Sequence, residues 1–600
     1  MSSSDAKKLR THTATMTRLF QSRVSSFKNR PDMLRFLRQL DENKAVTTAL
    51  NILGQGDWQC IGIDGSMDYD ERMQMILFYV AGTGYRCPLK ISKEKTSVDL
   101  KQLWRDENLS ATAAVPIWVE DAAAITGKRP TGETDFDFFY SMEGIPYALM
   151  LMAELHLAYL ASVEEPIKVI LLDRPLSTTF SSILNDLRML LRLRTSSLIG
   201  IKTPKGELSK LDLQLAAVLG SGQRYLPTRG QHLVARAIRE LIKGERTRSE
   251  LASALGFDED AVEKLAKRLM RFNELEEGLL LEKCDLTGFS VREGVKDYWY
   301  RITNVVEQIL DKVFRTKGEH PLLLDADKWL TVLDLNAINF FLLLMLVDKV
   351  NSTRKLIIGT AKDTMATDLT RAILPYEKWQ NNIKTENLYP NVRNDKAFLA
   401  ILSATNAESL RTPWRLRGYD SCFTTLLDNH DEKIPLRAAR KVVASEQLFV
   451  KSYFQLRSFK TDSTIRSPIF VYDRPLYPEL DRKSTHKFTI LERDRTQEIE
   501  PFFEDNELSE IDNLVLYLFS LQDNPEVVEA YGYNQLLYLA DKAVKARVRS
   551  MRGALRGIAG LELSALARRE RIFTILSRYR DMRSEREYSR ARFAGRGLGK

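Results

Sequence analysis

Short apolar runs that end in a carboxylate alternate with long apolar stretches in the first third of this 600-residue chain. A strand-like run, WQCIGID, ends at Asp64 and is followed by MQMILFYVAGTGYR, which we expect to pair with it. After an irregular region up to about Tyr140 come the helical segment IPYALMLMAELHLAYLAS and a second run, KVILLDRPLS, which contains Asp173. Nearly continuous apolar strands between helices are typical of sheets buried on both faces. The pattern therefore predicts an α/β core.

A different pattern occupies residues 223–302. Three helical segments follow one another, and the second is opened by Thr247 and Glu250 in capping-box spacing and closed by Gly256. The third segment has one apolar face, and GLLLEKCDLTGFSVREGVKDYWYRI after it resembles a two-stranded wing. This order predicts a winged helix-turn-helix inserted into the α/β core, which resumes after Ile302. Acidic and basic side chains mix on the third helix, so contact with DNA and contact with protein are both open.

Residue usage excludes several classes of protein. The longest unbroken apolar run, Phe340 to Val347, is far shorter than the ~20 residues that span a bilayer, so we expect a buried helix. The start of the chain has no apolar segment of the secretory kind. The 4 cysteines contain no CxxC pair and the 6 histidines no HxH or HExxH, which argues against a zinc ribbon and a histidine-based zinc hydrolase. We therefore expect a cytoplasmic protein with free thiols and no membrane partner.

Positive charge is concentrated at the C-terminus. Residues 541–600 hold 17 Lys and Arg against 6 Asp and Glu, a net charge of +11, whereas the whole chain is +9. An arginine-rich and acid-poor segment favours a polyanionic partner such as nucleic acid. A solvated helix with a frayed tail is the alternative.

Three acidic residues stand in apolar surroundings, where a lone carboxylate is costly. Asp64 and Asp173 end apolar runs, and Glu154 interrupts an apolar helix. A buried carboxylate needs a partner or takes up a proton. Taken singly, each could be a turn residue, a helix cap or half of a buried ion pair, and Asp64-Gly65 is also a strong hairpin signal. Taken together, they favour a site for Mg²⁺ or Mn²⁺, which prefer oxygen ligands. We expect Asp64 to end its strand and Gly65 to begin the turn beyond it.

The order of these residues resembles the NurA nuclease family. A strand with Asp-Gly-Ser, a glutamate in an apolar helix and a strand ending at Asp173 follow the family's order. Three later segments agree with it. KLIIGTAKD matches a family strand that ends in a lysine, which here is Lys362, and RNDKAFLAIL supplies the matching acid Asp395. SPIFVYDRP supplies Asp473, where glutamate is more usual. The resemblance covers about residues 55–200 and 350–550.

Two positions depart from the family pattern. The segment YGYNQLLYLADKAVKAR resembles a helix that ordinarily carries histidine after alanine, and Asp541 stands there instead. Arg174 follows Asp173 where the family tends to have glycine. Since RNase H-type sites often use a carboxylate on a C-terminal helix, we expect Asp541 to serve as a ligand in place of the histidine.

The resemblance implies an RNase H-like mixed sheet flanked by helices and a metal-dependent DNA nuclease. Two Mn²⁺ or Mg²⁺ ions would be bound by Asp64, Glu154, Asp173 and Asp541. Lys362 would contact the scissile phosphate or offset charge, and the lower-ranked Asp395 and Asp473 would be weaker or outer ligands. The resemblance also implies a homodimer that processes DNA ends from 5′ to 3′ in double-strand break repair, together with a HerA-type hexameric ATPase. The chain has no GxxxxGK[ST] motif, so this motor would be a separate partner.

The predicted organisation has five parts. They are an N-terminal helical segment (1–45), the first half of the nuclease core (46–222), the winged-helix insertion (223–302), the second half of the core (303–560) and a basic helical tail (561–600). The alternative to a nuclease is a non-catalytic DNA-binding or scaffold protein, with a degraded nuclease core and a working winged helix. A sequence-specific transcriptional regulator is a third, weaker hypothesis.

Overall fold

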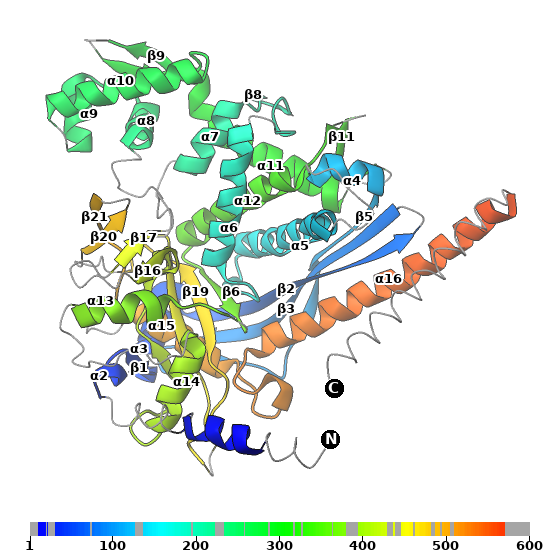
Figure 1. Cartoon of the computed structure of the whole chain (residues 1–600), viewed down its shortest axis with the longest axis vertical. Helices are drawn as coiled ribbons and strands as arrows, with labels where there is room; N and C mark the ends of the chain where they lie inside the picture. The colour runs from blue at the N-terminus through cyan, green and yellow to red at the C-terminus, as the bar shows by residue number, and fades with distance from the viewer. Residues whose placement is uncertain are drawn as a thin grey trace.

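The computed structural model describes residues 10–569 of the chain, apart from short internal segments (Figure 1). The segments outside the description are residues 20, 22–30, 73–74, 127–135, 194–195, 222–232, 257, 286–287, 316–318, 326–327, 363, 380–393, 429–435, 439–445, 460–461, 482–486, 493–494 and 505–508. Most of the predicted basic tail, and part of the predicted N-terminal segment, therefore lie outside the described residues.

One large mixed sheet organises the molecule. It has 11 strands in the order β1-β14-β18-β19-β13-β6-β2-β3-β4, with β15 paired to β18 and β5 to β3. The three central strands β13, β6 and β2 are parallel, and their other neighbours are antiparallel. The strands are β1 (Leu37–Gln39), β2 (Gly56–Arg72), β3 (Met75–Ile91), β4 (Thr96–Val98), β5 (Trp104–Trp118), β6 (Ile167–Leu172), β13 (Leu356–Ala361), β14 (Trp414–Leu416), β15 (Tyr419–Asp420), β18 (Phe449–Gln455) and β19 (Phe470–Pro475).

Helices cover both faces of this sheet, as the apolar runs predict (Figure 1). On one face lie α5 (Phe136–Val163), α6 (Leu176–Leu193) and α12 (Val332–Ser352). On the other lie α3 (Glu42–Leu53), α15 (Glu510–Leu521) and the long α16 (Gln535–Arg569). Alternate side chains of a strand point to opposite faces, so Ile61 and Ile63 join the core under α5 while Cys60 joins the core under α16.

The two most apolar helical regions are buried. The run Phe340–Val347 lies in α12 and is buried throughout, as predicted. Part of α5, Glu143–Val163, is long and apolar enough to cross a membrane by composition, but 72% of its most apolar window is buried inside the protein. A hydrophobic helix buried in this way is a core element.

Two expectations about the early strands are wrong. Asp64 does not end its strand, because β2 continues to Arg72 and pairs with β3 from Gly56↔Ile91 to Arg72↔Met75. The region before Tyr140 is not irregular: it contains β4, β5 and α4 (Val119–Thr126). Leu109, Val115 and Ile117 of β5 are buried, with exposed or half-buried residues between them.

Between α6 and α12 lies a mostly helical region. It contains α7 (Lys210–Leu219), α8 (Leu233–Lys243), α9 (Arg248–Leu255), α10 (Glu259–Leu275), the antiparallel pair β9 (Leu281–Cys284) and β10 (Phe289–Val291), and α11 (Tyr298–Phe314). The capping box of Thr247 with Glu250 is present, and Gly256 ends α9 with a left-handed φ of 71°. Three helices and a strand pair thus follow in the predicted order, and their assignment as a winged helix stays a prediction.

Shorter elements complete the described chain. They are α2 (Pro31–Leu34), α13 (Leu374–Trp379), α14 (Asp395–Thr405), a four-stranded sheet of β16 (Leu426–Asp428), β17 (Leu436–Ala438), β20 (Phe488–Glu492) and β21 (Arg495–Ile499), and the strand pairs β7 (Lys202–Thr203) with β8 (Gly206–Glu207) and β11 (Leu323–Asp325) with β12 (Lys328–Trp329).

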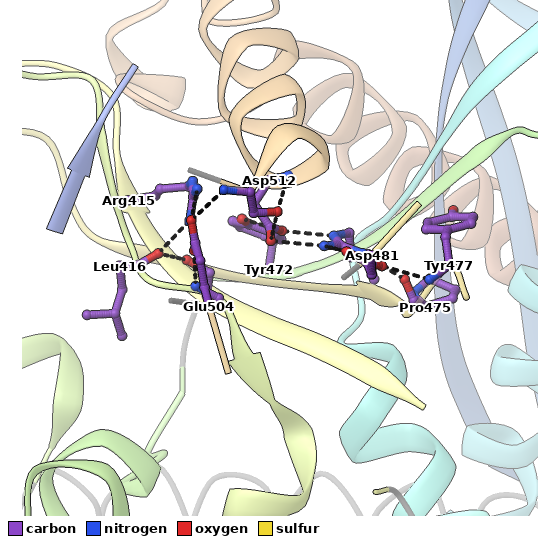
Figure 2. Close-up of polar contacts among 12 residues, drawn as sticks. Arg415, Leu416, Tyr472, Pro475, Tyr477, Asp481, Glu504 and Asp512 are labelled. Atoms are coloured by element: carbon purple, nitrogen blue, oxygen red, sulfur yellow. Dashed lines mark hydrogen bonds and ion pairs between the residues drawn. The ribbon is translucent and has the colours of Figure 1, made fainter. Parts of the chain in front are cut away.

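A buried ionic cluster fastens α15 to the sheet (Figure 2). Arg474 of β19 donates from Nε to Oδ1 of Asp512 on α15 at 2.8 Å and from Nη1 to Oδ2 of Asp481 at 2.7 Å. Arg415 of β14 donates to both oxygens of Glu504, at 2.6 and 2.7 Å. Both guanidinium groups are fully buried, and a buried charge of this kind is tolerated only when it is paired and hydrogen-bonded.

Candidate metal centre

Asp64 and Asp173 lie side by side because their strands are parallel neighbours. The register of β2 and β6 pairs Ile63 with Leu172, so the two aspartates follow at adjacent positions. The backbone N–H of Asp173 also donates to the carbonyl of Ile63 at 3.2 Å. On the far side of β6, β13 pairs Gly359 with Leu172 and brings Lys362 alongside. Its Nζ donates to Oδ2 of Asp173 at 2.8 Å.

Asp541 reaches the same place from α16. Helix α16 packs closely on β2 because Gly62 has no side chain, and a Cβ there would lie 2.7 Å from Cβ of Leu536. One oxygen from each of Asp64, Asp173 and Asp541 lies within 4.8 Å of the others. Asp64 is 7% exposed, and the side chains of Asp173 and Asp541 are 12% and 17% exposed. The three carboxylates thus form a mostly buried acidic group in which Asp173 and Asp541 are partly exposed.

The electrostatics of this acidic group centre on Asp64. Burial, and then the nearby charges of Glu154, Asp173 and Asp541, raise the pKa of Asp64 to about 9. Lys362 pairs with Asp173, and Lys545 pairs with Asp541 at 2.5 Å. No ion pair to Asp64 is found among the described residues, and its Oδ1 accepts only a local hydrogen bond from the N–H of Gly65, at 2.8 Å. Asp64 is therefore protonated at neutral pH unless a cation binds.

Glu154 lies on the opposite side of β2, on α5. Both of its oxygens accept hydrogen bonds from Arg174: Nε donates to Oε2 at 2.5 Å and Nη2 to Oε1 at 3.1 Å. A Cβ on Gly65 would lie 2.4 Å from Oε1 of Glu154, so only glycine lets the strand pass this carboxylate. The structure thus brings Glu154 next to the acidic group but leaves it outside the set of three.

Tyr533 is a member of the site that the sequence did not single out. Its hydroxyl donates to Oδ1 of Asp173 at 2.8 Å, and Nζ of Lys362 lies 4.5 Å from the centre of its ring. It precedes Asp541 by eight residues, and its place in the segment YGYNQLLYLAD is the signal that could have identified it.

Asp395 and Asp473 occupy other places. Asp473 of β19 accepts hydrogen bonds from the backbone N–H groups of Leu176 and Ser177, both at 2.8 Å, at the start of α6. Asp395 accepts from the N–H groups of Leu369 and Thr370, at 2.9 and 3.0 Å. Both carboxylates are almost completely buried and are bound to protein donors, and neither belongs to the group of three.

The donor set of the acidic group suits a hard divalent cation. Mg²⁺ and Mn²⁺ prefer carboxylate and water oxygens, keep several waters, and need only a few protein ligands. Asp64, Asp173 and Asp541 supply such oxygens, and the side chains of Asp173 and Asp541 are partly exposed to water. The residues present therefore fit a divalent cation, which would relieve the repulsion that raises the pKa of Asp64.

No protein-family model matches the sequence, and a search of curated proteins finds no significant match. Solved structures similar to this chain include NurA with manganese (11% identity, 91% of this chain and 97% of that chain, TM-score 0.34). They also include the NurA nuclease from Sulfolobus solfataricus, with 10% identity over 93% of this chain and 97% of that chain and a TM-score of 0.35. NurA bound to dAMP and manganese has 14% identity over 84% of this chain and 90% of that chain and a TM-score of 0.30. At these TM-scores the likeness extends only to the coarse architecture of a mixed sheet flanked by helices.

Proposed function

We propose that this chain is a metal-dependent DNA nuclease that hydrolyses phosphodiester bonds with water. The observation that supports it is the convergence of Asp64, Asp173 and Asp541, whose oxygens lie within 4.8 Å of one another beside an available lysine. A divalent cation bound there would lower the pKa of a bound water and offset the charge on the phosphodiester. The number of ions depends on Glu154, whose carboxylate is already bound by Arg174.

The chain's own residues have distinct parts in this hydrolysis. Asp64, Asp173 and Asp541 bind the cation. Tyr533 holds the carboxylate of Asp173 in orientation through its 2.8 Å hydrogen bond. Lys362 is 35% exposed, so its ammonium group is able to turn from Asp173 to a phosphate oxygen and stabilise the charge that develops there.

Positive charge next to the acidic group supports nucleic acid as the substrate. Along α16, Lys542, Lys545 and Arg549 are exposed, while Val544 and Val548 face the sheet. Spacings of three and four residues place the cations on one side of the helix, beginning beside Asp541. Cations arranged in this way bind the phosphates of DNA with a strong dependence on salt. The predicted basic tail, which continues beyond the end of α16 in the sequence, would extend this surface.

The sequence resemblance alone supports a wider proposal. In it the protein is a cytoplasmic homodimer that shortens DNA strands from the 5′ end in double-strand break repair, with a HerA-type ATPase as its motor. Strands labelled at the 5′ or the 3′ end and digested with Mn²⁺ would establish the polarity. Release of short products from the 3′ label first would contradict 5′-to-3′ degradation.

The decisive experiment compares wild type with Asp173→Ala on single- and double-stranded DNA, with Mn²⁺ and with EDTA. We expect cleavage by wild type that needs Mn²⁺, and loss of at least ~100-fold in the variant, because metal ligands act directly on the reacting group. Asp57→Asn is the matched control, since Asp57 lies on β2 with its side chain 85% exposed. DNA binding without Mn²⁺-dependent cleavage by wild type would favour the non-catalytic DNA-binding protein instead.

A further inference from the structure

Arg174 binds both carboxylate oxygens of Glu154. The Arg174 guanidinium donates to both carboxylate oxygens, at 2.5 and 3.1 Å, and the side chain of Glu154 is 3% exposed. Arginine presents its donors in a planar fork that matches the two oxygens of a carboxylate, and it keeps its charge at all accessible pH values. A cation that needs Glu154 as a ligand must therefore displace a fixed positive charge from a buried site.

The ion pair lies directly against the metal centre. Arg174 is the next residue after Asp173, and Gly65, next to Asp64, lies against Oε1 of Glu154. Burial lowers the pKa of Arg174, but the charges of Glu154, and then of Asp64 and Asp173, outweigh it and raise the pKa. The guanidinium thus interacts with the acidic group as well as with its own partner.

The net charge of the ionised centre is small. Four carboxylates (Asp64, Glu154, Asp173 and Asp541) face three cationic side chains, each paired with one carboxylate: Arg174 with Glu154, Lys362 with Asp173 and Lys545 with Asp541. The ionised centre therefore carries one negative charge. One divalent cation and one phosphodiester bring the net charge to zero, whereas two divalent cations and one phosphodiester leave a net charge of +2 beside the buried Glu154 and Asp64.

We propose that this centre binds one divalent cation, and that the Arg174 guanidinium holds the place of a second one as a permanent positive charge. The proposal rests on the proposed function for the cation itself, and it revises the expectation of two ions. It makes Arg174 a positioning residue: it keeps Glu154 away from the ion and sets how many ions the centre accepts.

The test is the stoichiometry of Mn²⁺ binding, measured by titration calorimetry and by the EPR signal of bound Mn²⁺, with no DNA present. We expect one ion per chain in wild type, and a second, magnetically coupled ion in Arg174→Ala, where Glu154 is released. Arg192→Ala is the control, because Arg192 is exposed on α6, and it should bind one ion.

Glu154→Gln provides an independent variant in case Arg174→Ala fails to fold. It should still bind one ion, since Glu154 is not a ligand in the proposed arrangement. Two ions in wild type, or loss of an ion in Glu154→Gln, would overturn the single-ion proposal and leave the nuclease proposal standing. No Mn²⁺ bound by wild type would overturn both, and a second ion in Arg192→Ala would show that Arg174 is not the determinant.

Discussion

Replacing Asp64 with asparagine should change how the stability of the metal-free protein depends on pH. Asp64 is 7% exposed, and burial together with the charges of Glu154, Asp173 and Asp541 raises its pKa from 3.8 to about 9. Between these two values the folded protein keeps a proton on Asp64 that the unfolded chain has lost. The folded state therefore binds more protons than the unfolded one, and its stability falls as pH rises through this range.

The size of the effect follows from the shift. One proton of difference changes the free energy of unfolding by ~1.4 kcal/mol per pH unit, so the contribution of Asp64 declines by about 4 kcal/mol between pH 5 and pH 8. Asparagine fills the same space without titrating. Relative to wild type, Asp64→Asn should become more stable by about this amount as pH rises over the three units.

Urea unfolding in EDTA at pH 5, 6.5 and 8 measures this difference, because groups shared by the two proteins cancel when wild type is subtracted. Asp57→Asn is the matched control on the same strand, and its difference from wild type should stay constant with pH. A difference between Asp64→Asn and wild type that is the same at pH 5 and pH 8 would refute the protonated state of Asp64, and with it the electrostatic account of the acidic group.

Three further outcomes are expected. At pH 7, Mn²⁺ binding should release about one proton per ion, because the proton on Asp64 must leave, and calorimetry in buffers of different ionisation enthalpy measures it; no release would contradict the assignment of Asp64 as a ligand. In Gly62→Ala the added Cβ would lie 2.7 Å from Cβ of Leu536 and would push α16 away from β2. This change should displace Asp541 and weaken Mn²⁺ binding. Unchanged affinity for Mn²⁺ would mean that α16 adjusts without moving Asp541. Glu504→Gln removes the paired carboxylate of the buried Arg415 and should lower the free energy of unfolding by ~3–5 kcal/mol in urea, and a loss below ~1 kcal/mol would show that this ion pair adds little to stability.

The buried elements of the fold could be predicted because burial leaves a local pattern. The run WQCIGID is a central strand, and Phe340–Val347 lies in a buried helix. Strand β5 was missed although Leu109, Val115 and Ile117 alternate with less buried residues. Its inward positions also include alanines, which have little preference for strands, and its outward positions are partly polar. A weak local preference was thus outweighed, in the folded protein, by pairing with β3.

The membership of the site was predictable only in part. Asp64 and Asp173 follow apolar runs, and the parallel register of β2 and β6 places them side by side, although Asp64 lies inside its strand and not at its end. The bonding of Glu154 by Arg174 was not predicted, because it depends on how α5 packs on the sheet. Ile170 and Leu172 face α5, and the same alternation places Arg174 on that side, where Glu154 lies. The residues around Asp473 in the sequence do not show whether it binds a metal or the N–H groups at the start of a helix, since a buried carboxylate suits both roles.

The order in which the residues of the acidic group are synthesised also affects how the protein folds. Asp64 stands near the beginning of the chain and Asp541 near its end, and at ~5–20 residues per second about 25 to 95 s of translation separate the two. During that interval the face of β3 that carries Tyr79 and Ala81 lacks its cover from Val544 and Val548. The nascent protein therefore carries an incomplete acidic group and an uncovered apolar sheet face until α16 has been synthesised. A chain that stops short of α16 should therefore lack the complete acidic group and should be prone to aggregate through this uncovered face.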